Sequence, residues 1–250
     1  MGDVAIIRLN DQKSLNAVSP QMVEELLDAF KETSRSKRAI VLTGVGRAFC
    51  SGANLGSLTY DHSESYDAGV LLESHFNPLM MVIRDLPLPF VTAVNGPAVG
   101  VGSTIALSGD LIIAAQDAYF LQAFRRIGVI PDAGTAYLLT RAVGRVRAME
   151  MMMLAEKLPA QRALDWGLVN RVVAQAEIEN AAIGLARDLA SGPTRTLAEI
   201  RKSCWHALEA DFAEQLARDR VVQRAMGQTA DHREGIAAFF DKRPAIFTGN

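Results

Sequence analysis

Apolar positions divide the first 45 residues into three elements. From residue 4 to residue 9 apolar and polar residues alternate in part, as in a β-strand. The stretch SPQMVEELLDAFKET, residues 19–33, repeats apolar residues at the helical period, and Ser19 followed by Pro20 is typical of a helix start. A short β-branched run at residues 39–43 then predicts a buried strand. The order strand, helix, strand indicates an α/β protein.

The same alternation continues in the middle of the chain. Residues 67–86 have the periodicity of a long helix, with a disturbance expected at Pro78. The pattern then predicts a strand, a helix and a strand at residues 89–96, 102–108 and 111–115. Helical patterns dominate afterwards, except for one strand-like run at residues 168–173. We therefore expect a sheet covered by helices.

The character of the chain changes after the SGP at residues 191–193. From there on the pattern predicts one charged helix after another and almost no strand. We therefore expect a core of residues 1–192 and a C-terminal helical segment of residues 193–250. Such a segment is small for an independent domain, so we expect it to pack on the core or on a neighbouring subunit.

Composition narrows the class of protein. The 26 basic and 28 acidic residues are mixed along the chain, and no dense basic stripe indicates nucleic-acid binding. The most apolar window, residues 97–115, contains Asp110 and several Gly and Ser residues, which favours a buried helix and strand over a membrane span. The two cysteines, Cys50 and Cys204, lie in no metal-binding spacing. We expect a cytoplasmic protein without a metal site or a disulfide.

Two glycine-rich turns follow predicted strands. They are GRAFCSGANL, residues 46–55, and VNGPAVGVGS, residues 94–103. Each can be an ordinary strand-to-helix turn. Facing each other, they would instead supply two backbone N–H donors to one oxygen, which is an oxyanion hole. Ile105 stands where a dinucleotide-binding fingerprint needs its third glycine, and no P-loop lysine is present, so nucleotide binding is not favoured.

One carboxylate stands alone in the uncharged stretch IGVIPDAGT, residues 127–135. Asp132 precedes a predicted helix, and an aspartate there often caps the helix N-terminus. The alternative is that Asp132 is the proton-transfer group of an enzyme. Apolar neighbours would suit the second role, because burial raises the pKa of a carboxyl. Those neighbours are Phe124, Ile127, Val129 and Ile130.

These stretches, taken in chain order, resemble the crotonase family, the enoyl-CoA hydratase/isomerase superfamily. The resemblance begins with LNDQKSLNAVSPQMVEEL, includes both glycine-rich turns, and continues through FLQAFRRIGVIPDAGTAYLLTRAVGR, LPAQRALDWGLVNRVV and FFDKRPAIF. It covers nearly the whole chain, and the wording IPDAG most resembles the epoxyphenylacetyl-CoA isomerase group. It implies a core that is a spiral of ββα units and a C-terminal helical segment used to form trimers, or dimers of trimers. It also implies an acyl-CoA thioester substrate and no further cofactor.

The resemblance also implies roles for particular residues. The backbone N–H groups of Ala53 and Val101 would hold the thioester oxygen, although the family commonly has glycine at the second of these positions. Lys13 and Lys242 would lie near the phosphates or the adenine of coenzyme A, with Lys242 acting across a subunit boundary. The other residues expected to contact the substrate are Ala17, Ser51, Gly52, Leu55, Gly100, Thr104 and Phe124.

The choice of reaction depends on the acid–base residues. Hydratases of this family use two glutamates, and their places are taken here by Thr104 and Phe124, which carry no carboxylate. Asp132 matches the acid–base aspartate of isomerase members. The resemblance therefore favours an enoyl-CoA isomerase. Two alternatives stay open, namely a hydratase with another water-activating group and an acyl-CoA-binding protein without activity.

Overall fold

The computed structural model describes residues 2–57 and 67–250, and its main layer is a parallel sheet of five strands. Their order across the sheet is β1-β2-β3-β5-β8, and every neighbouring pair runs parallel. The strands are β1 (Val4–Leu9), β2 (Ala39–Gly44), β3 (Phe90–Val94), β5 (Leu111–Ala115) and β8 (Arg171–Val173). All residues of β2 and β3 are buried, as expected for a parallel sheet with both faces covered. The strands predicted from the apolar pattern are thus confirmed.

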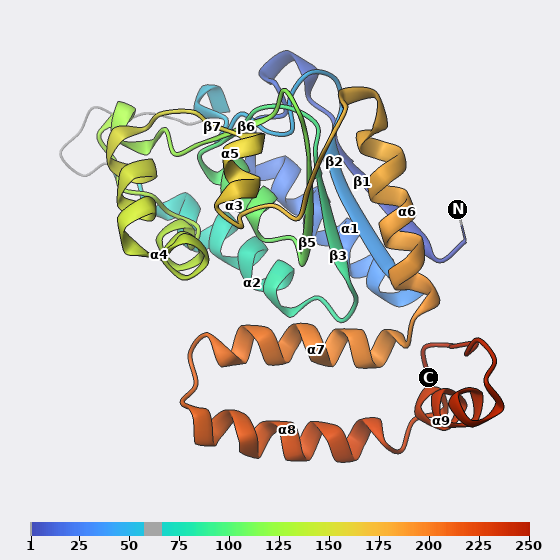
Figure 1. Ribbon diagram of the computed structural model, residues 1–250. Helices are drawn as coiled ribbons and strands as arrows, with labels where there is room; N and C mark the ends of the chain where they lie inside the picture. Colours follow the sequence, from blue (N-terminus) through green and yellow to red (C-terminus); the bar gives the residue numbers. More distant parts are fainter. Residues whose placement is uncertain (1, 58–66) are drawn as a thin grey trace.

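Helices cover this sheet and connect its strands (Figure 1). On one face α6 (Ile178–Ser191) packs against β1, β2, β3 and β5, while α1 (Pro20–Ser36) lies on the other face. The Ser19 side chain accepts a hydrogen bond from the Met22 N–H at 3.2 Å, so Ser19 is the predicted N-cap. Further core helices include α3 (Val101–Leu107), α4 (Thr135–Leu154) and α5 (Ala160–Asp165).

A second sheet has three very short strands. They are β4 (Ala98–Val99), β6 (Tyr119–Leu121) and β7 (Leu158–Pro159). Strand β6 pairs with β4 in parallel and with β7 antiparallel. This sheet brings the turn after β3 next to the segment that follows β5. It therefore positions both the start of α3 and the chain that leads to Asp132.

The helix predicted at residues 67–86 is shorter than expected. Helical residues begin at Val70, pass through a π-helical turn, Leu72–Phe76, and continue as α2 (Asn77–Asp85). Pro78 is in the first turn of α2, where a missing N–H is tolerated. The predicted disturbance therefore takes the form of a wide turn just before the proline.

The C-terminal segment forms a helical layer beside the core (Figure 1). It contains α7 (Thr194–Ala207), α8 (Phe212–Met226) and α9 (Ala230–Asp241). Helix α8 begins with a capping box in which Asp211 and Glu214 bond each other's backbone N–H,. Across residues 2–57 and 67–250, no helix combines the length and the apolar character that a membrane crossing needs.

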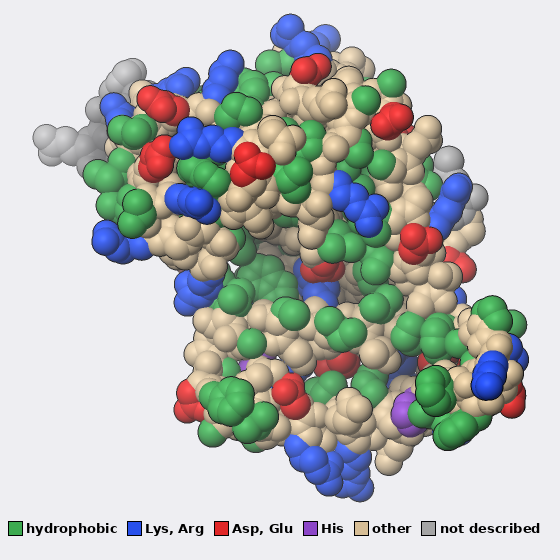
Figure 2. Space-filling view, in the orientation of Figure 1, with side chains coloured by type: hydrophobic (Ala, Val, Ile, Leu, Met, Phe, Trp, Pro, Cys, Tyr) green, Lys and Arg blue, Asp and Glu red, His purple; other side chains and the backbone are tan. Residues whose placement is uncertain are grey.

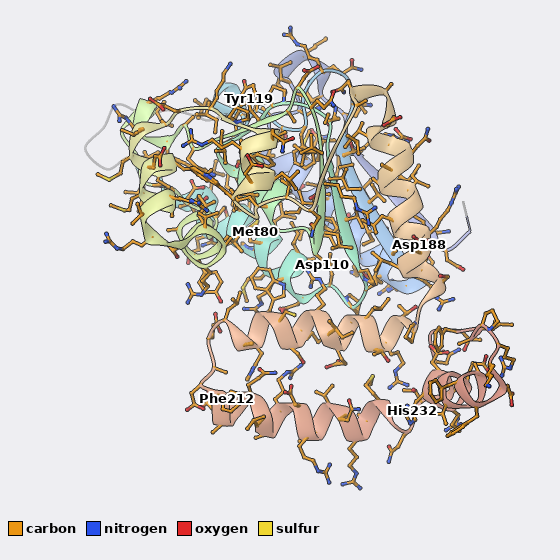
Figure 3. All side chains as sticks on the ribbon, viewed as in Figure 1. Met80, Asp110, Tyr119, Asp188, Phe212 and His232 are labelled. Atoms are coloured by element: carbon orange, nitrogen blue, oxygen red, sulfur yellow. The ribbon has the colours of Figure 1, made fainter. Side chains whose placement is uncertain are left out.

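One buried arginine joins this layer to the core. Arg201 of α7 is 5% exposed, and its Nε donates to the Asp110 carboxylate. Its other nitrogens donate to backbone carbonyls at the end of α2, those of Ile83, Arg84 and Leu86. Asp110 lies on the side of the core that faces α7 (Figure 3). The guanidinium therefore carries hydrogen bonds that no aliphatic side chain can replace.

Replacing Arg201 with methionine is expected to lower the free energy of unfolding by about 3–5 kcal/mol, because it leaves the Asp110 charge and the carbonyls without their donor. Urea denaturation would measure the change. The matched control is Lys202→Met on the same helix, which removes only a half-buried pair with Glu199 and should change stability by about 0.5 kcal/mol or less. Equal midpoints for the two variants would contradict the role assigned to Arg201.

Candidate active site

The first glycine-rich turn leaves the Ala53 N–H without an acceptor. Ala53 lies opposite Val18 in an isolated parallel bridge. The bridge is made by Gly52 and Asn54, since the Val18 N–H donates to the Gly52 carbonyl at 2.7 Å and the Asn54 N–H donates to the Val18 carbonyl at 2.9 Å. In the part of the chain that the structure describes, the Ala53 N–H has no partner. It is available to a ligand.

The second turn leaves the Val101 N–H available in the same way. Val101 is the first residue of α3, and the first N–H groups of a helix have no partner within it. The preceding Gly100 has φ 55° and ψ −129° and donates its own N–H to the Leu121 carbonyl at 2.8 Å. No described residue accepts a hydrogen bond from the Val101 N–H. The partial positive charge of the helix N-terminus adds to this donor.

The two turns are packed against each other. The Val99 N–H donates to the Cys50 carbonyl at 2.9 Å. A Cβ on Gly52 would lie 3.0 Å from the Val99 carbonyl oxygen, and a Cβ on Gly102 would lie 2.5 Å from the Cys50 Sγ. Glycine is therefore required at both positions for the approach. The sequence thus brings two unused N–H groups onto neighbouring turns, which is the arrangement that stabilises an oxyanion.

Cys50 packs between the two turns. Its side chain is fully buried beneath Gly102, and burial raises the pKa of its thiol to about 12. A thiol with such a pKa is not a nucleophile near neutral pH. Within the described ranges, no three His, Cys, Asp or Glu side chains gather as metal ligands.

Asp132 does not cap α4. The helix begins at Thr135, its N-cap position is Gly134, and no described side chain makes a capping hydrogen bond there. Ala133 and Gly134 both have positive φ, 50° and 82°, and the Thr135 N–H donates to the Asp132 carbonyl at 2.9 Å. Residues 132–135 therefore form a type I′ turn. The interpretation of Asp132 as an N-cap is wrong, because this turn separates its side chain from the helix.

The carboxylate of Asp132 is half-buried and poorly solvated. Its Oδ1 is buried and accepts a hydrogen bond from none of the described residues. Burial raises the pKa of the carboxyl from 3.8 to about 6, and a hydrogen bond from its own backbone N–H opposes this only in part. A carboxylate in this state is a stronger base than an exposed aspartate.

The prediction of which apolar residues desolvate Asp132 is only partly correct. Phe124 is 7% exposed and lies in a 3₁₀ turn, Phe124–Ile127, against Gly100. Ile127, Val129 and Ile130 are 58%, 38% and 82% exposed, so in one chain they cannot exclude water from the carboxylate. The buried residues beside Asp132 in the chain are instead Ala133, which follows it, and Thr135 at the start of α4. The prediction fails for the three exposed residues because an irregular segment has no helical or strand period from which buried and exposed positions can be told apart.

The structure brings most of the other predicted substrate contacts to the two turns. Ser51 donates its hydroxyl to the Ser14 carbonyl at 2.7 Å, which ties the first turn to the N-terminal loop. Ala17 in that loop is buried, and Leu55, in the 3₁₀ turn Leu55–Ser57, is 53% exposed. Gly52 and Gly100 face each other, since a Cβ on Gly100 would lie 3.9 Å from the Gly52 Cα. Contact of these residues with a substrate stays a prediction.

The two lysines do not come together in one chain. Lys13 is exposed in the 3₁₀ turn Gln12–Ser14 of the N-terminal loop. Lys242 is exposed at the end of α9, which Figure 1 places beyond the C-terminal end of α8 and away from α3. A contribution of Lys242 to a site across a subunit boundary stays a prediction.

A cavity of about 590 Å³ adjoins the Asp132 turn. It lies between the core and α7, where Figure 2 shows the surface hollowed, and Met80 of α2 is part of its lining. The rings of Tyr137 and Trp205 stack in its wall, 6.4 Å apart and 12° from parallel. Sequence reasoning missed this wall, because α4 and α7 are far apart in the chain. The apolar part of the lining includes Met80, Met81, Ala133, Leu138 and Trp205. Charged side chains complete it, those of Arg84, Asp85, Lys202, Glu209 and Arg218.

Comparison with known proteins agrees with this geometry. The sequence model of the enoyl-CoA hydratase/isomerase family matches residues 1–250. This chain belongs to that family. Its members include a probable enoyl-CoA hydratase of Rhodobacter capsulatus, 42% identical over 98% of this chain and 95% of the relative. They also include the 1,2-epoxyphenylacetyl-CoA isomerase of Escherichia coli, 39% identical with the same coverage of both chains.

Solved structures of the family have the same fold. An enoyl-CoA hydratase from a Polaromonas species superposes with a TM-score of 0.94 at 30% identity, covering 99% of this chain and 97% of that one. The crotonase fold predicted from the sequence is therefore confirmed. The relatives include enzymes named as hydratases and as an isomerase, so family membership alone does not choose the reaction.

Proposed function

We propose that this enzyme is an enoyl-CoA isomerase in which Asp132 moves a proton along the acyl chain. The observation that carries the proposal is the state of Asp132, whose buried Oδ1 has no partner among the described residues and whose pKa is raised to about 6. A general base works best when its pKa lies near the operating pH. The residues at the two hydratase glutamate positions, Thr104 and Phe124, supply no carboxylate.

The proposed reaction needs one base and one oxyanion site. Asp132 removes a proton from C2 of a 3-enoyl thioester, and the C–H electron pair forms a dienolate whose charge rests on the thioester oxygen. The Ala53 and Val101 N–H groups stabilise that oxygen. The protonated Asp132 then returns the proton to C4, which leaves the double bond between C2 and C3. Coenzyme A is part of the substrate, and the proposal includes no other cofactor and no metal.

The acyl group is proposed to extend toward the cavity beside the Asp132 turn. A volume of about 590 Å³ is in the range of small-molecule sites. The aromatic and methionine side chains of its wall suit an apolar or ring-containing acyl group. Lys13 would meet the phosphates of coenzyme A as a point charge.

Assembly into a trimer, or a dimer of trimers, belongs to the same proposal, as does a cytoplasmic location. Large apolar side chains are exposed on α8 and α9 and in the tail that follows. Phe212 is 80% exposed, and Phe239, Phe240 and Ile246 are each 75% exposed. Exposed apolar patches of this kind support a contact with another subunit.

A hydratase with a different water-activating group remains the second candidate, because the relative from Rhodobacter capsulatus is named a probable hydratase. The two reactions differ in product mass. Purified enzyme would be incubated with 2-enoyl, 3-enoyl, dienoyl and ring-epoxide phenylacetyl thioesters of coenzyme A. We expect a product of unchanged mass and altered retention time from at least one thioester. A gain of 18 mass units (about one water) would favour the hydratase, and no product from any thioester would favour a binding protein.

A further inference from the structure

Two buried threonine hydroxyls connect α3 with the Asp132 turn. Thr104 of α3 and Thr135 at the start of α4 are each 1% exposed, and their Oγ1 atoms lie 2.5 Å apart. The Thr135 Oγ1 also lies 2.7 Å from the Asp132 carbonyl oxygen. A hydroxyl carries only one proton. Because the carbonyl has none, Thr135 donates to Asp132, and Thr104 must then donate to Thr135.

This chain of hydrogen bonds has one defined direction. The other acceptor near the Thr104 hydroxyl, the Gly100 carbonyl, is 3.4 Å away and is the weaker partner. The Asp132 carbonyl receives two hydrogen bonds from Thr135, one from the N–H at 2.9 Å and one from the hydroxyl. Both bonds act on the backbone carbonyl of Asp132, and neither involves its carboxylate.

The turn that these bonds hold is strained. Ala133 has φ 50°, a left-handed conformation that is unfavourable for a residue with a Cβ. Such a conformation persists only where the surroundings determine it. The Thr135 bonds close the turn, and the Thr104 hydroxyl fixes Thr135. Without these hydrogen bonds the turn would relax more easily, and the Asp132 carboxylate would be held less firmly in place.

The same chain connects the base to the oxyanion site. Thr104 lies one helical turn after Val101, whose N–H is one of the two oxyanion donors proposed above. The position of Asp132 relative to that donor is therefore set by α3, by two hydroxyls and by one backbone carbonyl. A displacement of about 1 Å between catalytic groups can lower a rate by about 10²-fold.

We propose that Thr104 and Thr135 are positioning residues that hold Asp132 at a fixed place relative to the Val101 N–H. The proposal rests on the proposed function, because Asp132 is the base only there. It assigns to Thr104 a role other than the substrate contact expected from the sequence. Neither hydroxyl touches the reacting atoms; each acts through the backbone of Asp132.

Valine tests the hydroxyls, because it keeps the shape of threonine and removes only the hydrogen bonds. We expect Thr135→Val to lower kcat about 10–100-fold with KM changed less than about threefold, and Thr135→Ser to restore most of kcat. Thr104→Val should act in the same direction. The double variant should lose about as much as the more damaging single variant, since both residues belong to one chain of bonds.

The matched control is Thr140→Val on the same helix. The Thr140 hydroxyl donates to the Ala136 carbonyl of its own helix at 2.7 Å, so its loss should leave kcat unchanged. A second measurement does not depend on activity. Amide hydrogen exchange in peptides spanning residues 129–140 should become faster in Thr135→Val and in Thr104→Val than in Thr140→Val.

The outcomes separate this inference from the proposed function. Unchanged kcat and unchanged exchange in both valine variants would overturn the positioning role, and so would faster exchange with unchanged kcat while Asp132→Asn is inactive. If Asp132→Asn retains full activity, the proposed function fails instead. Faster exchange in the two valine variants would then still show that the hydroxyls hold the turn.

Discussion

Asp132→Asn is expected to melt at a higher temperature than the wild type at pH 8 while its turnover falls about 10²–10⁴-fold. Turnover falls because asparagine cannot accept the proton. Stability rises because the folded wild type must hold an ionised carboxylate in a poorly solvated place, with its Oδ1 unpartnered by any described residue. Asparagine removes that charge at nearly the same size. An enzyme that uses a strained or destabilised group commonly shows this exchange of stability for activity.

The pH dependence follows from the raised pKa. Below about pH 3.8 the carboxyl is protonated in both the folded and the unfolded chain, and the group makes no difference to stability. Between that pH and about 6 the folded chain retains a proton that the unfolded chain has released, so the wild type loses stability as the pH rises. Above about 6 the loss is complete. The difference in the free energy of unfolding between variant and wild type should therefore grow from pH 4 to about 6 and stay constant at higher pH.

The size of that gap is expected to be about 1–2 kcal/mol, because the partial exposure of the side chain screens the charge. For a chain of this length each kcal/mol moves the melting temperature by about 2–4 °C. The wild-type rate should rise with pH through about 6 and then level, and the variant should lack this limb. Calorimetry and a pH–rate profile would measure both effects.

Asp117→Asn is the control for this experiment. Asp117 is an exposed carboxylate in the turn between β5 and β6, so its neutralisation should change neither the rate nor the melting temperature. A variant Asp132→Asn that melts below the wild type at pH 8 would contradict the prediction. It would show that the carboxylate makes a stabilising contact and is not held in an unfavourable place.

Val101→Pro is expected to lower kcat about 10²–10³-fold, the usual effect of losing one oxyanion donor. A backbone donor is hard to remove by mutation, but this position permits it. Val101 is the first residue of α3, where proline is tolerated because its missing N–H serves no bond within the helix. Gly100 has no Cβ to collide with the proline ring. The helix should therefore form, and only the donor to the thioester oxygen should be lost.

Val101→Ala is the matched variant, since it removes the same side chain and keeps the N–H. Its kcat should remain near that of the wild type. Circular dichroism and melting temperatures would establish that both variants fold. If the proline variant turns over as fast as the alanine variant, the Val101 N–H does not stabilise the transition state.

The apolar pattern predicted the central sheet well because buried parallel strands are continuous apolar runs. It gave β2 and β5 within one residue of their observed ends. It missed β4, β6 and β7, which have two or three residues each and are too short to show a period. The long helix before β3 was predicted without the π-helical turn that it contains, Leu72–Phe76.

The sequence likewise predicted some features of the candidate site and missed others. The glycine spacing predicted two turns that present backbone N–H groups, because turns that pack closely against each other need glycine, and glycine is visible in the sequence. The hydrogen bond between Thr104 and Thr135 could not be predicted from the sequence. The two threonines are 31 positions apart, and a threonine in either place has nothing unusual about it. Arg201 was missed for the same reason, because its partner Asp110 is 91 positions away.

The proposed anion site is made of backbone groups and the proposed base is a side chain, and this difference has an evolutionary consequence. The proposed oxyanion donors are backbone groups on two interlocked turns, and a Cβ at residue 102 would meet the Cys50 carbonyl oxygen at 2.7 Å as well as its side chain. No substitution at residue 50 relieves that collision, whereas a codon change at residue 132 alone removes the proposed base. New reactions on this scaffold are thus expected to arise by exchanging the acid–base side chain over an inherited anion site.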